Sequence, residues 1–254
     1  MIKREHIVPR RNAILMSIVS FVLLPSSAFA MHISEGILPF SWSLVWFAAS
    51  APFLALGLRT LARRSEIDLS SKPLVGMIAA VVFIISCMPI PIPTAGTCSH
   101  PCGTGLAAVV LGPALSVVVA AVALLIQALF LSHGGLSTWG ANLFAMGVVG
   151  SFAGYLAFRT LRACGAGPVA AAFAAGLIAD WATYATTALI LAAGIRGESP
   201  FWPLAGKIAL AFVPTQLPLG IIEGAITAGM VSLLCKKRPD LLARTALAAT
   251  EGKG

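Results

Sequence analysis

The sequence predicts an all-α polytopic membrane protein with about seven transmembrane helices, present after an N-terminal signal peptide is removed. Hydrophobic residues make up 58% of the 254 residues, charged residues make up only 10%, and the mean hydropathy is +0.94. Apolar stretches of about 20 residues, the length that crosses a bilayer, fill most of the chain. This composition excludes an ordinary soluble domain. The sequence contains no Walker A motif, so an ATP-driven function would need another subunit.

Residues 1–30 have the pattern of a secretory signal peptide. Four basic residues within the first eleven precede an apolar run at residues 14–24, and Ala28-x-Ala30 then forms a small-residue cleavage site. Cleavage after Ala30 would make Met31 the new N-terminus. The alternative is that translation begins at Met31, and this alternative leaves the same first residue.

A histidine in the second position of a free N-terminus can chelate a metal ion. The amine of Met31, the backbone nitrogen of His32 and its imidazole can close two fused rings around one ion. Three nitrogens then lie in a plane, and a fourth position is open to another residue. Such ligation suits Ni(II) and Cu(II), and Co(II) can be accommodated. The alternative is that His32 is simply a polar residue that follows a cleavage site.

The mature chain contains six long apolar stretches separated by loops that carry the charges and the turn residues. They are residues 40–58, 73–88, 103–131, 139–158, 168–193 and 204–234. The third stretch has 29 residues and is interrupted by Gly112-Pro113. At about 1.5 Å per residue it is too short for two full spans, but a broken segment packed within protein is tolerated in a membrane.

The distribution of basic residues decides how often residues 103–131 cross the membrane. Signal cleavage would leave the new N-terminus outside and place the basic loop at residues 59–72 inside, as the positive-inside rule requires. Two crossings, separated at the Gly-Pro break, also bring the basic residues at 159–162 and 236–238 inside. We therefore predict seven spans, of which the third is short enough to be a half-helix. The protein is expected in the inner (plasma) membrane with a cytoplasmic C-terminus.

This topology places Met31, His32, His100 and His133 on the same outer face. His100 is the best candidate for the fourth ligand, because it lies in a loop rich in Gly, Thr and Ser and supplies another nitrogen. The alternative is a loop histidine that contacts lipid head groups or caps the next helix. His133 would support the site or line its entrance.

Several other residues are candidates for supporting roles. Cys98 and Cys102 flank the loop histidine, and free thiols are favoured over a disulfide or over metal ligation. Asn142 could orient a ligand histidine. Gln127 is expected to form a hydrogen bond between helices rather than to serve the site. Glu35 is expected either behind the ligands or in the first turn of a helix.

Two carboxylates, Asp180 and Glu223, fall within predicted spans. A charge at membrane depth is costly and usually faces protein or water. These residues could form a cation path or a coupling element, or they could be buried acids that fix helix packing. They also define a rival hypothesis, an intramembrane metalloenzyme. A second rival, an autonomous cation carrier, would often show internal repeats, which the sequence lacks.

Four ordered motifs resemble the CbiM/NikM family, the substrate-capture (S) components of energy-coupling factor (ECF) transporters for cobalt and nickel. The motifs are MHISEGILP at 31–39, TCSHPCGTGL at 97–106 followed by LGP at 111–113, HGGLSTWGAN at 133–142, and PLGIIEG at 218–224. The resemblance covers essentially the whole mature chain. It divides the sequence into a cleaved signal at 1–30, a transmembrane metal-binding domain at 31–235 and a basic tail at 236–254.

The resemblance implies an S-component fold with an additional N-terminal helix. It implies that Met31, His32 and His100 bind the transported metal and that the chain carries no prosthetic group. The implied partners are a transmembrane coupling (T) subunit, two cytoplasmic ATPases and a small auxiliary membrane subunit, and toppling of the S component would deliver the ion. The Cys-Ser-His-Pro sequence favours Co(II) for cobalamin synthesis, with Ni(II) as the alternative.

Two positions depart from the family pattern. Cys102 stands where threonine is expected, and Ala145 stands where a polar residue is frequent. The net charge of +8 is explained as a topology signal, and no nucleic-acid partner is expected.

Overall fold

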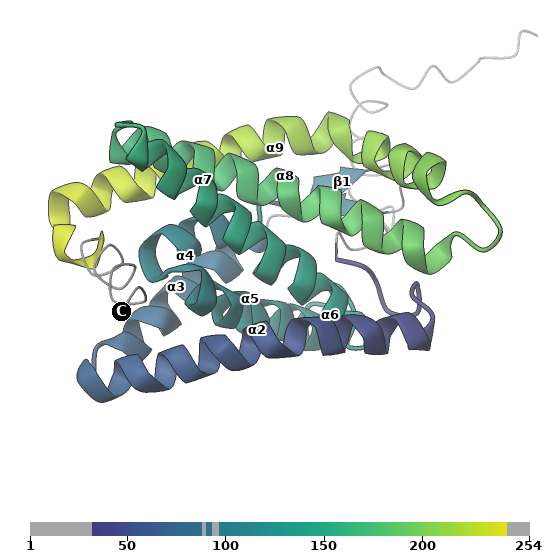
Figure 1. Cartoon of the computed structure of the whole chain (residues 1–254), viewed down its shortest axis with the longest axis horizontal. Helices are drawn as coiled ribbons and strands as arrows, with labels where there is room; N and C mark the ends of the chain where they lie inside the picture. The colour runs from purple at the N-terminus through teal and green to yellow at the C-terminus, as the bar shows by residue number, and fades with distance from the viewer. Residues whose placement is uncertain (1–31, 88–89, 93–96, 243–254) are drawn as a thin grey trace, which may run out of the picture.

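A computed structural model of the chain describes residues 32–87, 90–92 and 97–242, and these residues form a bundle of long helices (Figure 1). The predicted signal peptide and Met31 lie outside the described residues. In chain order, the elements are α2 (Phe40–Ile67), α3 (Ser71–Ser86), β1 (Ile90–Ile92), β2 (Thr97–Ser99), α4 (Thr104–Leu111), α5 (Pro113–Phe130), α6 (Trp139–Asn142), the π-helix η1 (Leu143–Gly150), α7 (Ser151–Ala163), α8 (Pro168–Ile195) and α9 (Phe201–Lys237).

Five helices in the described part are long and apolar enough to cross a membrane: α2, α5, the continuous segment from α6 to α7, α8 and α9. The apolar α3 has 16 residues and α4 has eight. With these two, the structure contains the seven predicted helical segments in the predicted order. The all-α polytopic class is confirmed. The 37 residues of α9 would extend for about 55 Å, well beyond a hydrocarbon core of about 30 Å.

The third predicted span is a half-helix that lies inside the protein. It ends at Leu111, and α5 begins at Pro113, so the break falls at the predicted Gly-Pro pair. Gly112 has a φ of 91°, a conformation that glycine adopts readily, and proline is favoured in the first turn of the next helix. Every residue of α4 is buried. Protein therefore surrounds the broken backbone, as a membrane interior requires.

An acidic side chain and a basic side chain lie at the two ends of α4. The Glu223 carboxylate accepts hydrogen bonds from the backbone N–H groups of Cys102 and Gly103, the latter at 2.9 Å. At the other end, Arg64 Nη1 donates to the carbonyl oxygen of Leu111 at 2.9 Å. Both contacts satisfy backbone groups that a helix end leaves unpaired, and both match the helix dipole. Glu223 thus has the packing contact that the sequence analysis left as one of its alternatives.

The loop between α3 and α4 contains a short hairpin that the sequence analysis did not predict. Its strands β1 and β2 are antiparallel, and Pro91 lies opposite Cys98. Proline is tolerated there because a two-stranded ribbon has only edge strands. The hairpin leads the chain toward His100, and two strands of three residues each do not change the fold class.

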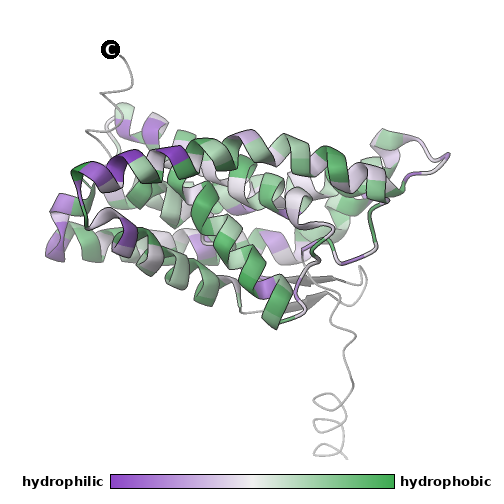
Figure 2. Cartoon of the chain, turned by 90° about the horizontal axis from the view of Figure 1, so that it is seen from below, coloured by the Kyte–Doolittle hydropathy of each residue, from purple (hydrophilic) through white to green (hydrophobic). Residues whose placement is uncertain are grey.

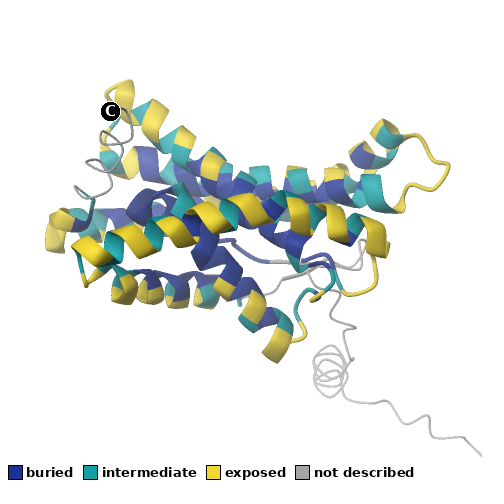
Figure 3. Cartoon of the chain, turned by 60° about the horizontal axis from the view of Figure 1, so that its bottom comes forward, coloured by how far each residue is buried: buried dark blue, intermediate teal, exposed yellow. Residues whose placement is uncertain are grey.

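The outward faces of the helices are apolar, as expected for a membrane-embedded bundle. Figure 2 shows hydrophobic residues along the lengths of the helices, with hydrophilic residues concentrated near their ends. Figure 3 shows that many of the outward-facing positions are exposed, while the central elements are buried. Large exposed hydrophobic side chains include Leu44, Leu56, Ile84, Leu129, Leu156 and Ile221. Exposed apolar surface of this extent is typical of a protein that contacts lipid or a partner protein.

Small residues allow α8 and α9 to pack closely. A Cβ atom at Gly176 would lie 2.7 Å from the carbonyl oxygen of Glu223, and one at Gly224 would lie 2.8 Å from that of Phe173. These separations are too short for any side chain, so glycine permits the contact. The close packing holds Asp180 of α8 and Glu223 of α9 in the same core.

Candidate metal centre

Three histidines from distant parts of the chain meet in one cluster. The ring centroids of His32 and His100 are 4.8 Å apart, and each lies 5.1 Å from the ring of His133. One ring nitrogen from each lies within 4.8 Å of the other two. His32 is 5% exposed and His100 is fully buried, whereas His133 is partly exposed. The structure therefore brings together the two histidines expected at the site and adds the third at its edge.

Hydrogen bonds determine which nitrogen of each ring carries the proton. His100 Nδ1 lies 2.9 Å from the carbonyl oxygen of Pro101, an acceptor, so Nδ1–H donates and Nε2 keeps its lone pair. His32 Nε2 lies 3.0 Å from Gln127 Oε1 and 3.2 Å from His100 Nε2, which are both acceptors. His32 therefore carries its proton on Nε2 and keeps a lone pair on Nδ1, the nitrogen closer to its own backbone.

Burial keeps these imidazoles neutral. Burial and the neighbouring His133 lower the pKa of His100 to about 3. Burial also lowers the pKa of His32, and the two other histidines add to the shift. The pKa of His133 is lowered by burial alone. At neutral pH the rings therefore present lone pairs, and a neutral imidazole is the form that binds a metal.

Gln127 of α5 holds His32 in this state. Its amide nitrogen donates to both the carbonyl oxygen and the hydroxyl of Ser86, at 3.2 and 2.8 Å, which turns its Oε1 toward His32. The sequence analysis expected only a hydrogen bond between helices, and the structure shows that bond together with the contact to His32. A polar residue inside an apolar span was the available signal, but its partner is 95 residues away.

Replacing Gln127 with leucine is expected to lower metal affinity by about 10- to 100-fold, the usual effect of removing a partner that orients a ligand histidine. The reason is that His32 Nε2–H loses its acceptor and the ring loses its fixed orientation. Calorimetric titration of the purified protein with Co(II) would measure the change. Ser86→Ala, which leaves the carbonyl acceptor of residue 86 in place, is the matched control and should have a smaller effect. Unchanged affinity in the leucine variant would contradict this role.

Asn142 and Thr138 fix the backbone next to His32. Asn142 Oδ1 accepts the N–H of Ile33 at 2.8 Å, and its Nδ2 donates to the carbonyl oxygen of the same residue at 3.2 Å. The hydroxyl of Thr138 donates to that oxygen as well. From the sequence, we expect Asn142 to orient a ligand histidine. In the structure it holds the main chain of Ile33, the residue that follows His32.

The N-terminal segment packs directly on the loop that contains His133. Glu35 is exposed, and its Oε2 accepts the N–H of Ser137 at 3.0 Å. Gly134 has a φ of 85°, and a Cβ atom there would lie 2.9 Å from the Cβ of His32. At Gly135, a Cβ atom would overlap the backbone of Glu35. Two consecutive glycines thus allow the segment to come close enough for His32 to reach the other histidines.

Of the two cysteines that flank His100, only Cys102 has a side chain that the structure describes. The side chain of Cys98 lies outside the described part. Cys102 is a free, buried thiol whose Sγ lies 3.8 Å from Asp180 Oδ1. Burial and the nearby carboxyl groups of Glu223 and Asp180 raise the pKa of this thiol, so it is protonated at neutral pH. Cys102, Asp180 and Glu223 form a second cluster, which is separate from the histidines.

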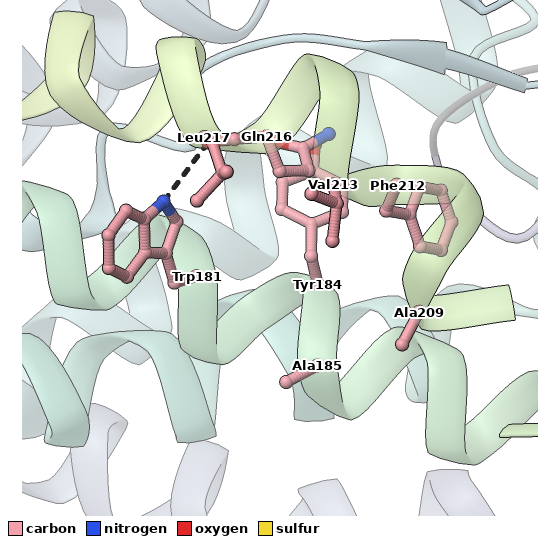
Figure 4. Close-up of a pocket in the computed structure, with 8 residues that line it drawn as sticks. All are labelled: Trp181, Tyr184, Ala185, Ala209, Phe212, Val213, Gln216 and Leu217. Atoms are coloured by element: carbon pink, nitrogen blue, oxygen red, sulfur yellow. Dashed lines mark hydrogen bonds between the residues drawn. The ribbon is translucent and has the colours of Figure 1, made fainter. Parts of the chain in front are cut away.

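A cavity of about 170 Å³ lies between α8 and α9 (Figure 4). Its lining is largely apolar, and Trp181 Nε1 donates to the carbonyl oxygen of Gln216 at 3.0 Å. Tyr184, which also lines the cavity, donates to the carbonyl oxygen of His100 at 3.2 Å. The cavity therefore has no group of metal ligands, and it lies behind the loop that carries His100.

Comparison with known proteins places this architecture in a family. Residues 32–241 match the family model CbiM, described as a cobalt uptake substrate-specific transmembrane region. A cobalt transport protein CbiM of Geobacter sulfurreducens is 65% identical over 94% of this chain and 69% of its own length. Another from Sorangium cellulosum is 58% identical over 84% of this chain and 95% of its own length.

Solved structures agree with this assignment. A crystal structure of a transition metal transporter has a TM-score of 0.74 and 29% sequence identity, and the match covers 81% of this chain and 93% of the other. A truncated transition metal transporter has a TM-score of 0.73 at 29% identity, with 81% and 99% covered. The chain, an integral membrane protein of all-α architecture, therefore belongs to the CbiM family.

Proposed function

We propose that this chain is the substrate-capture component of an ATP-driven ECF transporter and that it binds Co(II) at the outer face of the membrane. The proposal is based mainly on three neutral imidazoles that lie together at one end of a membrane-embedded helical bundle. Two of them are buried and the third is partly buried. The family match supports cobalt as the substrate, because the relatives are named as cobalt transport proteins.

The proposed ligands are the amine of Met31, the backbone nitrogen and imidazole of His32, and the imidazole of His100. The protonation states described above support this set. His32 has a lone pair on Nδ1, from which a ring to its own backbone nitrogen can close, and His100 has a lone pair on Nε2. His133 is the most exposed of the three histidines and is assigned to the entrance. The amine requires that residues 1–30 be removed.

Energy for transport comes, in this proposal, from partner proteins. The sequence has no nucleotide-binding motif, so a pair of cytoplasmic ATPases would act through a transmembrane coupling (T) subunit, with a small auxiliary membrane subunit. The histidine end of the bundle would face outward and the basic C-terminus would face the cytoplasm, in agreement with the positive-inside rule. The imported cobalt would supply cobalamin synthesis.

Ni(II) is the alternative cargo, because nitrogen ligands bind nickel more tightly than cobalt in the usual affinity order. Competition between the two ions for the purified protein would distinguish them. Co(II) that displaces Ni(II) at equal concentration would support the cobalt assignment. Displacement in the opposite direction would favour nickel.

Uptake into proteoliposomes is the experiment that tests the ATP-driven mechanism. The chain reconstituted with its T subunit and ATPases is expected to accumulate Co(II) when ATP is present on the cytoplasmic side. The chain alone is expected to bind Co(II) without accumulating it, because it has no means of using ATP. A version with an inactive ATPase is the control. Accumulation by the chain alone, driven by an ion gradient, would instead indicate an autonomous carrier.

A further inference from the structure

The second cluster of titratable side chains lies in the core, at the N-terminal end of the half-helix α4. Cys102, Asp180 and Glu223 come from the loop before α4, from α8 and from α9, and one ligand atom of each lies within 4.8 Å of the other two. Their exposed fractions are 0%, 0% and 1%. The proposed histidine site does not use them.

Two carboxyl groups in a buried core need a proton or a cation to neutralise them. Among the residues that the structure describes, the one salt bridge joins Arg238 and Asp240 at the surface, so neither Asp180 nor Glu223 has a cationic partner there. In addition, Asp180 Oδ2 is buried and accepts no hydrogen bond from any described residue. A buried carboxylate oxygen without a donor is unusual and costly. A metal ion bound in the cluster would offset the charge of both carboxylates.

The spacing of the donors fits metal coordination. Bonds of about 2.3 Å to sulfur and 2.1 Å to oxygen, at a tetrahedral angle, place the two donor atoms about 3.6 Å apart. The observed separation of Cys102 Sγ and Asp180 Oδ1 is 3.8 Å. Glu223 is already held in place by two backbone N–H groups, and each of its oxygens has a second lone pair for an ion. Three protein ligands leave a fourth position for water.

We propose that Cys102, Asp180 and Glu223 form an inner binding site for a divalent transition-metal ion such as Co(II). Carboxylates alone would favour Mg²⁺ or Ca²⁺, and the sulfur ligand shifts the preference toward Co(II) and Zn(II). On binding, the Cys102 thiol loses its proton to solvent and the sulfur binds the ion. The N-terminal end of α4 stabilises the remaining negative charge of the site.

The inner site lies directly behind the histidine cluster. Cys102 follows His100 by two residues. Tyr184, which donates to the carbonyl oxygen of His100, follows Asp180 by four residues on α8, a rise of about 6 Å. An ion released by the histidines could therefore reach the inner site within the same chain.

Titration of the full chain with Co(II) alone, in lipid nanodiscs under reducing conditions, tests the proposal. The wild-type protein is expected to bind a second, weaker equivalent that brings a sulfur-to-cobalt charge-transfer absorption in the near ultraviolet. Cys102→Ser should abolish this absorption and the second equivalent, and Asp180→Asn should weaken both. Cys235→Ser, at a partly buried cysteine of α9, is the matched control and should change neither.

The test is independent of the histidine site. In the His32→Ala variant the absorption should persist while the other equivalent is lost, so a failure of the proposed function would not be mistaken for a failure of the inner site. Wild-type protein that shows no sulfur-to-cobalt absorption would overturn the proposal, because the cluster would then be a proton-sharing acid pair. An absorption that survives Cys102→Ser would overturn it as well.

Discussion

Replacing His100 with alanine is expected to remove high-affinity Co(II) binding from the purified protein. The Nε2 atom of His100 carries a lone pair and lies 3.2 Å from His32 Nε2, and the residue is fully buried. The substitution removes a proposed ligand. The decrease in Co(II) affinity should therefore exceed the roughly 10- to 100-fold expected for Gln127, which only orients a ligand histidine. Calorimetric titration with Co(II) would measure it.

The fold should survive this change. The contact of Tyr184 with this loop is made to the backbone oxygen of His100, which alanine retains. The His133→Ala variant should weaken Co(II) binding less than His100→Ala does, because His133 is assigned to the entrance of the metal site. Wild-type affinity in His100→Ala, in a protein that melts as a folded species, would show that the ligand assignment is wrong.

Replacing Gly135 with alanine is the second substitution with a large expected effect. The added Cβ atom would overlap the backbone of Glu35. The segment that carries His32 would therefore have to move away from the loop that contains His133 and Gly135. Overpacking of this kind costs about 1–3 kcal/mol. If the cost falls on docking of this segment, Co(II) affinity decreases by about 5- to 150-fold, at 1.4 kcal/mol per factor of ten.

Gly206→Ala is the control for this substitution. Gly206 lies in α9 with nothing within 4 Å of its added Cβ, so alanine fits there and improves helix propensity. Co(II) affinity should be unchanged in this variant. Equal affinities in Gly135→Ala and the wild type would show that close docking of the N-terminal segment is not required for binding.

The order of the membrane helices was largely predictable from sequence because each depends on local signals. An apolar length of about 20 residues marks a span, and Gly112-Pro113 marks a break wherever it occurs. The hairpin β1–β2 was not predictable, since its strands are only three residues long and β1 has a proline at its centre. The π-helix η1 was also missed, because its apolar sequence reads as continuous α-helix.

The site was predictable only in part. His32 and His100 stand out by their positions, at a freed N-terminus and in a polar loop. The contacts that orient His32 cross 95 and 109 residues, from His32 to Gln127 and from Ile33 to Asn142, and they arise from tertiary packing. The grouping of Cys102 with Asp180 and Glu223 depends in the same way on how α8 and α9 pack.

The intact mass and metal content of one purified membrane sample test whether a freed N-terminus at Met31 binds the metal. We expect a chain that begins at Met31 and carries Co(II) or Ni(II) at the histidine site, because the free amine is one of the proposed ligands. A chain that still begins at Met1 and binds metal with the same affinity would contradict it, since residue 31 would then have no free amine to contribute.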